Sequence, residues 1–382
     1  MILNEEQIKI VEDQSRFIFV LAGAGSGKTR VIAERIKRLI HEGVKEETIL
    51  CLTFTRKAAH EMKSRLSTGV VVDTFHGYCY ELLSKHQTFK IFEFNQEFEE
   101  EDILQISNYK NQLKKVEKPK QYDYYQSYLK RRQLIDYDDL LLLSIPYIQN
   151  HPFIYIFIDE FQDTNLLQFT LLEKMIKKQV SLFAVGDPDQ SIYAFRGAKV
   201  ELINHFVKKY QVKVMKLEYN YRSHQRILDG ANHLIDRNLN RFKKQLVGRR
   251  DDIVEPKIYI GRENQIEQKI IEIIKSIDTN DIAILYRNHF QVVRIKQILK
   301  RHYLFHVKLL TMHEAKGLEF DCIILIGCEL LPYDKDETYS GKEEERRLFF
   351  VGLTRAKRHL YLFSKRINSF LNETKIPILH LM

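Results

Sequence analysis

Residues 17–29 read Phe-Ile-Phe-Val-Leu-Ala-Gly-Ala-Gly-Ser-Gly-Lys-Thr. The apolar run 17–21 predicts a buried strand, and the apolar spacing over residues 31–39 predicts a helix. A strand, a glycine-rich turn and a helix that begins at Lys-Thr form a phosphate-binding loop, whose backbone N–H groups surround phosphate oxygens. The sequence therefore predicts a bound nucleoside triphosphate.

Within this loop we expect Lys28 to reach the β- and γ-phosphates and the Thr29 hydroxyl to ligate Mg²⁺. Ala22 stands where the usual motif has glycine, which is a mild departure because the later glycines form the tightest part of the turn. The residues expected to surround the nucleotide are Ala22, Gly23, Ala24, Gly25, Ser26, Gly27, Lys28, Thr29 and Arg30.

The composition is that of a globular chain with room for two or three domains: 382 residues, 44% hydrophobic and 29% charged. The net charge of +9 suits a polyanionic partner, although mildly basic proteins are common. The four cysteines form no Cys-x-x-Cys pair, which argues against a metal centre or a disulfide framework. No apolar run approaches the about 18 residues of a membrane span, and no signal peptide is evident, so we expect a cytoplasmic protein.

Short β-branched runs alternate with longer helical stretches along the chain. Continuous apolar strands separated by helices predict parallel α/β sheets, and a helical region after about residue 200 divides the strands into two sets. The expected domains are 1–88 with 132–211, a mostly helical insertion at 89–131, and 212–382.

Two charged regions leave alternatives open. The tyrosines of the insertion lie beside lysines and arginines and suit base stacking, but the helical spacing favours a core-facing stripe of Tyr122, Tyr125 and Leu129. A basic cluster over residues 237–250 could follow a phosphate backbone or form a solvated helix face.

Two predicted strands end in side chains suited to phosphoryl transfer. The strand 153–158 is followed by Asp159, expected to hold Mg²⁺, and by Glu160, expected to polarise the attacking water. The strand 180–185 leads to Gln190, which can sense the γ-phosphate or orient water.

Tyr193, Phe195 and Arg196 follow Gln190 closely and join a nucleotide sensor to base-stacking groups. Aromatic faces stack on the bases of single strands without sequence preference, so this segment is typical of coupling between hydrolysis and nucleic-acid binding. A core position is the alternative for both rings; we favour it for Tyr193 and favour a base contact for Phe195.

In this order the motifs resemble those of the UvrD/Rep/PcrA family of superfamily 1 DNA helicases, from Asn4-Glu5-Glu6-Gln7 to Thr354-Arg355-Ala356-Lys357. The resemblance covers nearly the whole chain. It implies two tandem RecA-like domains with ATP in the cleft, ATP and Mg²⁺ as cofactors, and 3′→5′ movement along single-stranded DNA or a single-strand/duplex junction.

The resemblance also implies roles for further residues. Gln7 looks like the adenine-reading glutamine, although Asn4-x-x-Gln7 is also a capping box and the two can hold together. From the residues alone, Arg222 and Arg355 could be ordinary surface arginines. The implied nucleotide contacts are Tyr221 on adenine, Arg222 and Arg355 on the γ-phosphate, and Glu319 on the ribose.

A row of DNA contacts is implied as well. The segment 52–59 resembles the first DNA-contact motif and 73–77 the second, while Phe195 stands where the family usually has a larger Trp ring. The implied DNA contacts are Phe54, Thr55, Thr74, Phe75, His76, Tyr193, Phe195, Arg196 and His313.

One departure from the family is large. Only Gln291–Leu310 lie where relatives carry a second accessory subdomain, and twenty residues cannot hold a domain. We therefore expect a near-minimal motor without that subdomain, without a nuclease domain, and with a protein partner that supplies duplex separation or nuclease activity.

Two other functions fit part of the motif set. An ATP-gated sensor that binds DNA and signals to a partner enzyme would carry the same motifs. A small-molecule kinase would explain the phosphate loop but neither the segments 73–77 and 190–197 nor Glu319.

Overall fold

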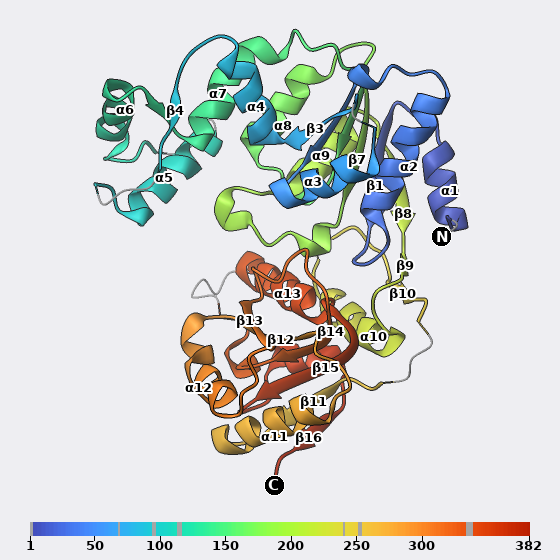
Figure 1. Cartoon of the computed structure of the whole chain (residues 1–382), viewed down its shortest axis with the longest axis vertical. Coiled ribbons are helices and arrows are strands. Elements are labelled where there is room, and N and C mark those ends of the chain that lie inside the picture. Colours follow the sequence, from blue (N-terminus) through green and yellow to red (C-terminus); the bar gives the residue numbers. More distant parts are fainter. Residues whose placement is uncertain are drawn as a thin grey trace. The chain divides into compact units, whose positions relative to one another are not determined.

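The computed structural model describes residues 3–67, 69–93, 97–112, 117–239, 241–250, 254–333 and 339–382. The chain forms two compact units. Unit 1 comprises Met1–Ala22, Lys28–Asp187 and Tyr193–Leu217, and unit 2 comprises Gly23–Gly27, Pro188–Ile192 and Glu218–Met382. Unit 1 runs from blue to green in Figure 1, and most of unit 2 from yellow to red.

Unit 1 is built on a parallel six-stranded sheet with the order β3-β2-β6-β7-β1-β8. Its inner strands are apolar throughout and buried, as expected for a sheet with helices on both faces. The strands are β1 (Phe17–Ala22), β2 (Ile49–Thr53), β3 (Val71–Thr74), β6 (Tyr155–Ile158), β7 (Ser181–Gly186) and β8 (Lys213–Leu217).

The helices of unit 1 form two packed groups. Contacts join α1, α2 and α3 in one group and α4, α7 and α8 in the other. Their bounds are α1 (Glu5–Glu12), α2 (Lys28–His41), α3 (Arg56–Arg65), α4 (Phe75–Ser84), α7 (Tyr137–Ile148), α8 (Leu166–Met175) and α9 (Glu201–Lys209).

The last strand of unit 1 differs from the prediction. We expected the second domain to begin at residue 212, but β8 pairs in parallel with β1, from Ile18 opposite Lys213 to Ala22 opposite Leu217. The first sheet therefore extends to Leu217. The sequence Lys-Val-Met-Lys-Leu is amphipathic because β8 is a partly exposed edge strand, so it lacks the apolar run that marks the inner strands.

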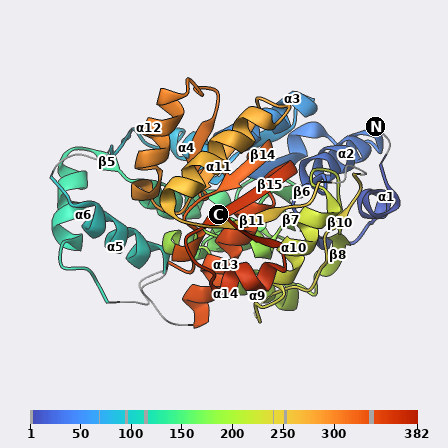
Figure 2. The same cartoon turned by 90° about the horizontal axis from the view of Figure 1, so that it is seen from below.

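The insertion contains α5 (Glu100–Asn111) and α6 (Tyr122–Arg131), drawn in teal in Figure 2. A short strand, β4 (Lys90–Ile91), pairs with β5 (Leu134–Ile135) at its base. No strand was expected there, since two residues are too few to give a periodic signal.

Aromatic residues form a separate small core inside the insertion. Tyr125 and Leu129 are buried in it, which confirms the core interpretation for these two residues, whereas Tyr124 is exposed and its hydroxyl donates to Glu97. The cluster consists of Phe92, Phe98, Ile106, Tyr125, Tyr128 and Leu129.

A buried ion pair joins this insertion to the rest of unit 1. The Nζ of Lys110 on α5 lies 2.6 Å from Asp136 and 2.7 Å from Asp139, at the start of α7. Burial alone would lower the pKa of Lys110, but the two carboxylates outweigh burial and the pKa is raised. The ammonium group therefore remains charged and holds α5 against α7.

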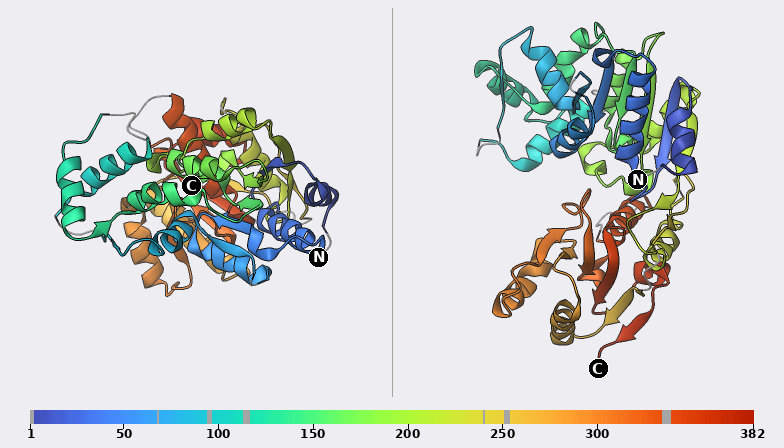
Figure 3. Two further views of the ribbon diagram at one scale, coloured as in Figure 1. Left: turned by 90° about the horizontal axis from the view of Figure 1, so that it is seen from above. Right: turned by 45° about the vertical axis from the view of Figure 1, so that its right-hand side comes forward.

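Unit 2 contains a second parallel six-stranded sheet, with the order β13-β12-β14-β15-β11-β16. Helices α11 and α12 pack together, and α10 packs with α13 and α14; in the right-hand view of Figure 3 the two groups lie on opposite sides of the sheet. The strands are β11 (Lys257–Ile260), β12 (Ile282–Tyr286), β13 (Lys308–Thr311), β14 (Phe320–Leu325), β15 (Ala356–Ser364) and β16 (Ile378–His380).

Unit 2 carries its own set of helices, together with one short two-stranded ribbon. Between β12 and β13 the chain forms the short helix η5 (His289–Val292) and α12, and nothing larger. The elements are α10 (Gln225–Ile235), α11 (Glu263–Ser276), α12 (Val293–Arg301), α13 (Tyr339–Leu353), α14 (Ser369–Thr374) and the pair β9 (Tyr219–Asn220) with β10 (Val247–Gly248).

The two tandem parallel α/β sheets predicted from the sequence are thus confirmed. Within the described ranges, the helices are all too short or too polar to cross a lipid bilayer.

Candidate nucleotide and nucleic-acid sites

The phosphate loop occupies residues 23–27, between the end of β1 and the start of α2. Gly25 and Gly27 have φ angles of +63° and +83°, in the left-handed region that side chains disfavour. A Cβ atom on Gly25 would lie 2.7 Å from Cβ of Arg222 and 2.9 Å from Nδ2 of Asn220. Glycine is therefore required at residue 25, both for the turn and for this close approach.

Asn220 holds the loop through its side-chain amide, which is fully buried. Its Nδ2 donates to the Ala24 carbonyl at 2.6 Å, and its Oδ1 accepts from the backbone N–H groups of Arg222 (2.8 Å) and Ser223 (2.7 Å). One side chain thus links the phosphate loop to the segment that carries Arg222. The sequence assigned Asn220 no role, because nothing in the pattern reveals an internal hydrogen-bond partner.

Lys28 and Glu160 form an ion pair in unit 1, with Nζ 3.2 Å from Oε1. Lys28 begins α2, and Glu160 follows β6 in a left-handed conformation with φ +53°, a strained position for a residue with a side chain. Such strain is found more often at functional sites than elsewhere. Thr29 and Arg30 continue the first turn of α2 and are half-buried.

Asp159 is buried at the end of β6, immediately before Glu160. Burial, together with the neighbouring Glu160 carboxylate, raises the pKa of Asp159 to about 7, although the Lys28 ammonium acts in the opposite direction. Its Oδ1 accepts a hydrogen bond from the Glu160 N–H at 2.9 Å. The Asp159 carboxyl group therefore lies where an additional positive charge would favour its ionised form.

Gln162 connects this acidic pair to the end of the neighbouring strand. Its side-chain Nε2 donates to Glu160, and its Oε1 accepts from the Asp187 N–H at 2.8 Å. Sequence reasoning did not assign Gln162 a role. It lies in the short helix η2 (Phe161–Asp163), and its bond to the backbone of Asp187 leaves no signal in the sequence.

Gln190 ends the short helix η3 (Pro188–Gln190), which belongs to unit 2 by its contacts. Nη2 of Arg355 donates to Oε1 of Gln190 at 3.0 Å, and Nζ of Lys316 donates to the Gln190 carbonyl at 2.8 Å. Arg355 is buried and also donates to the carbonyls of Val351 (3.0 Å) and Leu318 (3.2 Å). Arg355 is therefore an internal residue that is bonded to Gln190, not a surface arginine.

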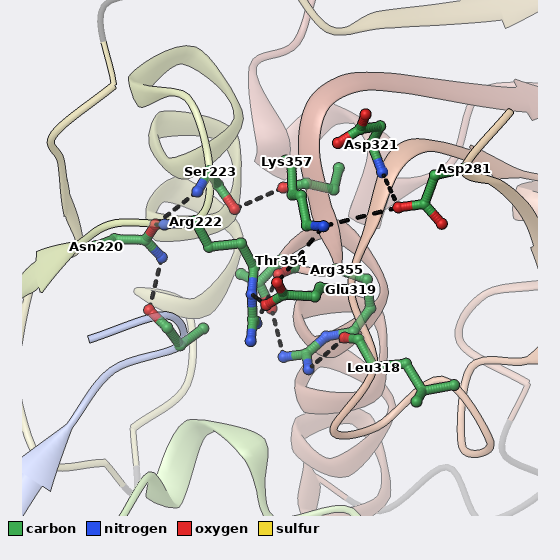
Figure 4. A network of polar contacts seen from close by, with 12 residues as sticks. Asn220, Arg222, Ser223, Asp281, Leu318, Glu319, Asp321, Thr354, Arg355 and Lys357 are labelled. Carbon is green, nitrogen blue, oxygen red and sulfur yellow. Dashed lines mark hydrogen bonds and ion pairs between the residues drawn. The ribbon is translucent and has the colours of Figure 1, made fainter. Parts of the chain in front are cut away.

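Arg222 and Glu319 form a second ion pair in unit 2 (Figure 4), with Nε 2.6 Å from Oε2. Nη1 of Arg222 also donates to the Thr354 carbonyl at 3.3 Å, and Lys357 lies 3.5 Å from Glu319. Burial would raise the pKa of Glu319, but the two cations outweigh it and the pKa is lowered. Three predicted nucleotide contacts, Arg222, Glu319 and Arg355, thus have internal partners in unit 2. The fourth, Tyr221, is exposed.

Gln7 forms the capping box that its spacing predicted. Its N–H donates to Oδ1 of Asn4 at 2.7 Å, and its Oε1 accepts from the Asn4 N–H at 3.2 Å. The side chain is buried. A contact between Gln7 and adenine stays a prediction.

Three aromatic rings form a row on unit 1. Phe54 and Tyr193 stack with centroids 5.4 Å apart at 21°, and Tyr193 meets Phe195 edge-on at 6.0 Å. Phe195 is 47% exposed, whereas the other two are half-buried. Tyr193 is therefore not a core residue as we favoured, because its ring lies between two partners at the surface.

The other predicted DNA contacts of unit 1 lie at the starts of two helices. Thr55 and Thr74 are the N-caps of α3 and α4 and accept from the N–H groups three residues later. Phe75 is buried, so its ring face is not available to a base, contrary to our expectation. His76 packs edge-on against Tyr137 at 5.4 Å, and burial lowers its pKa to about 4, which keeps the ring neutral.

A groove of about 1160 Å³ in unit 1 brings several of these residues together. It runs between the start of α4 and the insertion, and Phe54, Thr74, His76 and Tyr193 line it. Its other walls carry both cations and carboxylates, including Lys63, Arg56, Asp136 and Asp138. The last predicted contact, His313, is half-buried in unit 2, while the Arg196 side chain lies outside what the structure describes.

The basic cluster 237–250 fits neither alternative fully. The side chains of Lys244 and Arg241 are almost completely buried and bind the equally buried Asp189, with Nη2 of Arg241 2.9 Å from the carboxylate. Asp189 directly precedes Gln190 in η3. These two cations therefore hold η3 in place, and only Arg237, Lys243 and Arg249 of the cluster are exposed.

Two parallel six-stranded sheets in tandem, with a phosphate loop after the first strand, define a RecA-like protein of the phosphate-loop class. The model of the UvrD/REP helicase N-terminal domain matches residues 3–118 and 91–211, and that of the UvrD-like helicase C-terminal domain matches 215–306 and 302–366. The chain therefore belongs to the UvrD/Rep family of ATP-dependent DNA helicases.

Curated relatives agree with this assignment. A probable DNA helicase of Mycoplasma pneumoniae is 31% identical over 96% of this chain and 84% of its own length. The ATP-dependent DNA helicase Rep of Buchnera aphidicola subsp. Schizaphis graminum is 32% identical over 80% of this chain, and PcrA of Staphylococcus epidermidis 33% over 76%. The chain spans about half the length of these Rep and PcrA relatives, 55% and 48% respectively.

We expect Lys244→Met to destabilise unit 2, because it removes one of the two cations that bind the buried Asp189 carboxylate. Leaving a buried charge without any partner costs about 3–5 kcal/mol, and we expect a smaller loss here because Arg241 remains paired with Asp189. Urea unfolding followed by circular dichroism would measure this. The neighbouring exposed Lys243→Met is the matched control and should leave the midpoint unchanged; equal midpoints for both variants would contradict the structural role of Lys244.

Proposed function

We propose that this protein is an ATP-dependent translocase and helicase that moves 3′→5′ along single-stranded DNA. The observation that carries the proposal is the pair of bonds from Arg355 and Lys316 to Gln190. Gln190 lies only five residues before the exposed ring of Phe195. A side chain suited to sensing a phosphate is therefore joined by a short segment to a ring suited to stacking on a base.

The nucleotide part of the proposal rests on the phosphate loop and the two internal ion pairs. Phosphate oxygens would compete with Glu160 for Lys28 and with Glu319 for Arg222. Once Lys28 turns to the phosphates, the Glu160 carboxylate becomes available to accept a proton from the attacking water. Arg222 and Arg355 would then neutralise charge that develops on the transferring phosphoryl group.

Mg²⁺ is part of the same proposal, with Thr29 and Asp159 as its protein ligands. Hydroxyl and carboxylate oxygens are the donors that this ion prefers. Burial and the neighbouring Glu160 carboxylate raise the pKa of Asp159, and a bound cation would favour its ionised form. When bound, the ion would neutralise phosphate charge during transfer. Asp159 would orient it from the rigid end of β6, beside Glu160.

The nucleic-acid part rests on the row of Phe54, Tyr193 and Phe195. Stacked rings at a surface groove offer faces for successive bases, whatever their sequence. We further propose a protein partner for duplex separation, since η5 and α12 alone connect β12 to β13. A cytoplasmic location belongs to the same proposal, because all four cysteines are free thiols.

Translocation on single-stranded DNA tests the proposal. Streptavidin would be placed on the 5′ or the 3′ end of separate oligonucleotides, and its displacement followed with and without ATP. ATP-dependent displacement from the 5′ end alone is the expected result. DNA-stimulated ATP hydrolysis without displacement from either end would overturn the motor and favour an ATP-gated sensor.

Lys28→Ala and Glu160→Gln should separate nucleotide binding from hydrolysis. We expect both to lower DNA-stimulated ATP turnover about 100- to 10,000-fold, since each removes a group that acts on the transferring phosphate or the water. Glu160→Gln should still bind a fluorescent ATP analogue, whereas Lys28→Ala should bind it weakly. Lys37→Ala, further along α2 and exposed, is the control; normal turnover in Lys28→Ala would exclude this site.

Phe195→Ala should weaken the coupling to DNA while leaving DNA-free hydrolysis nearly intact. Loss of one stacking contact of about 1–3 kcal/mol should raise the DNA concentration for half-maximal stimulation about 5- to 150-fold. The measurement is ATPase activity titrated with oligo(dT). Phe195→Trp should match or exceed the wild-type protein. An equal fall of DNA-free and DNA-stimulated activity in Phe195→Ala would instead indicate a packing role.

A further inference from the structure

A continuous stretch of unit 2, residues 282–313, contains no aspartate or glutamate. It forms β12, η5, α12 and β13. The whole chain has 51 acidic residues among 382, so a run of this length without one is unusual for this protein. Its cations are Arg287, Arg294, Lys296, Lys300, Arg301 and Lys308.

Two of these cations are neutralised by carboxylates from other elements. Arg287 pairs with Glu345 at 2.9 Å, and Arg294 with Glu267 at 2.9 Å. The other four cations are exposed, and among the described residues none of them has a carboxylate within ion-pair distance. The end of a helix carries only about half a negative charge, so Lys300 and Arg301 in the last turn of α12 exceed what its dipole requires.

Two aromatic rings project from the loop between α12 and β13. Tyr303 is 82% exposed and Phe305 72%, and their rings meet edge-on with centroids 6.2 Å apart. Two other residues of the loop anchor it: Val307 is buried in the core of unit 2, and Leu304 packs against that core. The loop is thus held by Leu304 and Val307, while the two rings remain in solvent.

Tyr303 occupies a position that glycine would fill with less strain. Its φ angle is +57°, and it follows the last turn of α12 in a helix-ending motif where the Leu304 N–H donates to the Leu299 carbonyl at 2.9 Å. Glycine is the residue that this motif usually places in the left-handed position. The tyrosine ring therefore adds neither a core contact nor a favourable backbone conformation to the fold.

We propose that Tyr303 and Phe305, with Lys300, Arg301 and Lys308, form a further contact surface for single-stranded nucleic acid on unit 2. Exposed rings stack on bases, neighbouring cations contact phosphates, and no carboxylate from the same stretch opposes a polyanion. That the ligand is a nucleic acid rests on the proposed function. That these residues form a contact surface is inferred from the exposure of the two rings and from the neighbouring cations. It belongs to unit 2 and adds to the row of rings on unit 1.

The test uses two variants of the full chain. Fluorescence polarisation with labelled oligo(dT) of 30 nucleotides should show about tenfold weaker binding for Tyr303→Gly/Phe305→Ser. Its thermal midpoint should be no lower than that of the wild-type protein, because glycine relieves the strain at residue 303. Lys300→Gln/Arg301→Gln should reduce the slope of log K against log salt by about 1.4, at about 0.7 for each cation lost.

A matched charge control is Lys37→Gln/Lys45→Gln, two exposed lysines of unit 1, which should keep the wild-type salt slope. Unchanged affinity and slope in the two test variants, with the wild-type protein binding normally, would overturn this surface and leave the proposed function intact. Absence of oligonucleotide binding by the wild-type protein would overturn both. Loss of self-association in Tyr303→Gly/Phe305→Ser with unchanged DNA affinity would assign the rings to a second copy of the chain and overturn the proposal.

Discussion

The side-chain amide of Asn220 is the contact on which the nucleotide site depends most directly. With three short hydrogen bonds it joins the phosphate loop at Ala24 to the backbone of Arg222 and Ser223. A buried amide that lost one of these partners would leave polar groups unsatisfied, so the phosphate loop and the segment 220–223 are fixed relative to each other. Ser223 continues this hydrogen-bond network, since its hydroxyl donates to the carbonyl of Ala356 at 2.6 Å. Ala356 directly follows Arg355 in the chain.

Within each unit, several charged side chains near the predicted nucleotide contacts form ion pairs. Lys28 faces Glu160, Arg222 faces Glu319, and Asp189 is held by Lys244 and Arg241. The side chains of the first two pairs are partly exposed, whereas those of the third are buried, where the loss of one partner is costly. The chain therefore combines two pairs within reach of solvent with one buried pair that holds a segment in place.

Most of the fold, and the phosphate loop between β1 and α2, could be predicted from the sequence, because apolar runs and glycine spacing report directly on backbone structure. The strand β8 was missed since an amphipathic edge strand lacks that signal. The roles of Lys244, Asn220 and Gln162 could not be predicted, because their partners are far away in the chain or bonded through the backbone. For Phe75 the sequence predicted a DNA contact that the structure does not allow. The ring is buried, and its place in a motif does not reveal burial.

The membership of the two units also bears on how the chain can be divided. Gly23–Gly27 and Pro188–Ile192 belong to unit 2 by their contacts, although unit 1 surrounds both in the sequence. A fragment that begins at Glu218 would lack the backbone that Asn220 binds and the glutamine that Arg355 binds. A fragment that ends at Leu217 would keep those loops without their partners. No single cut therefore yields two self-sufficient halves, and complementation of separately expressed pieces would have to rebuild both loops.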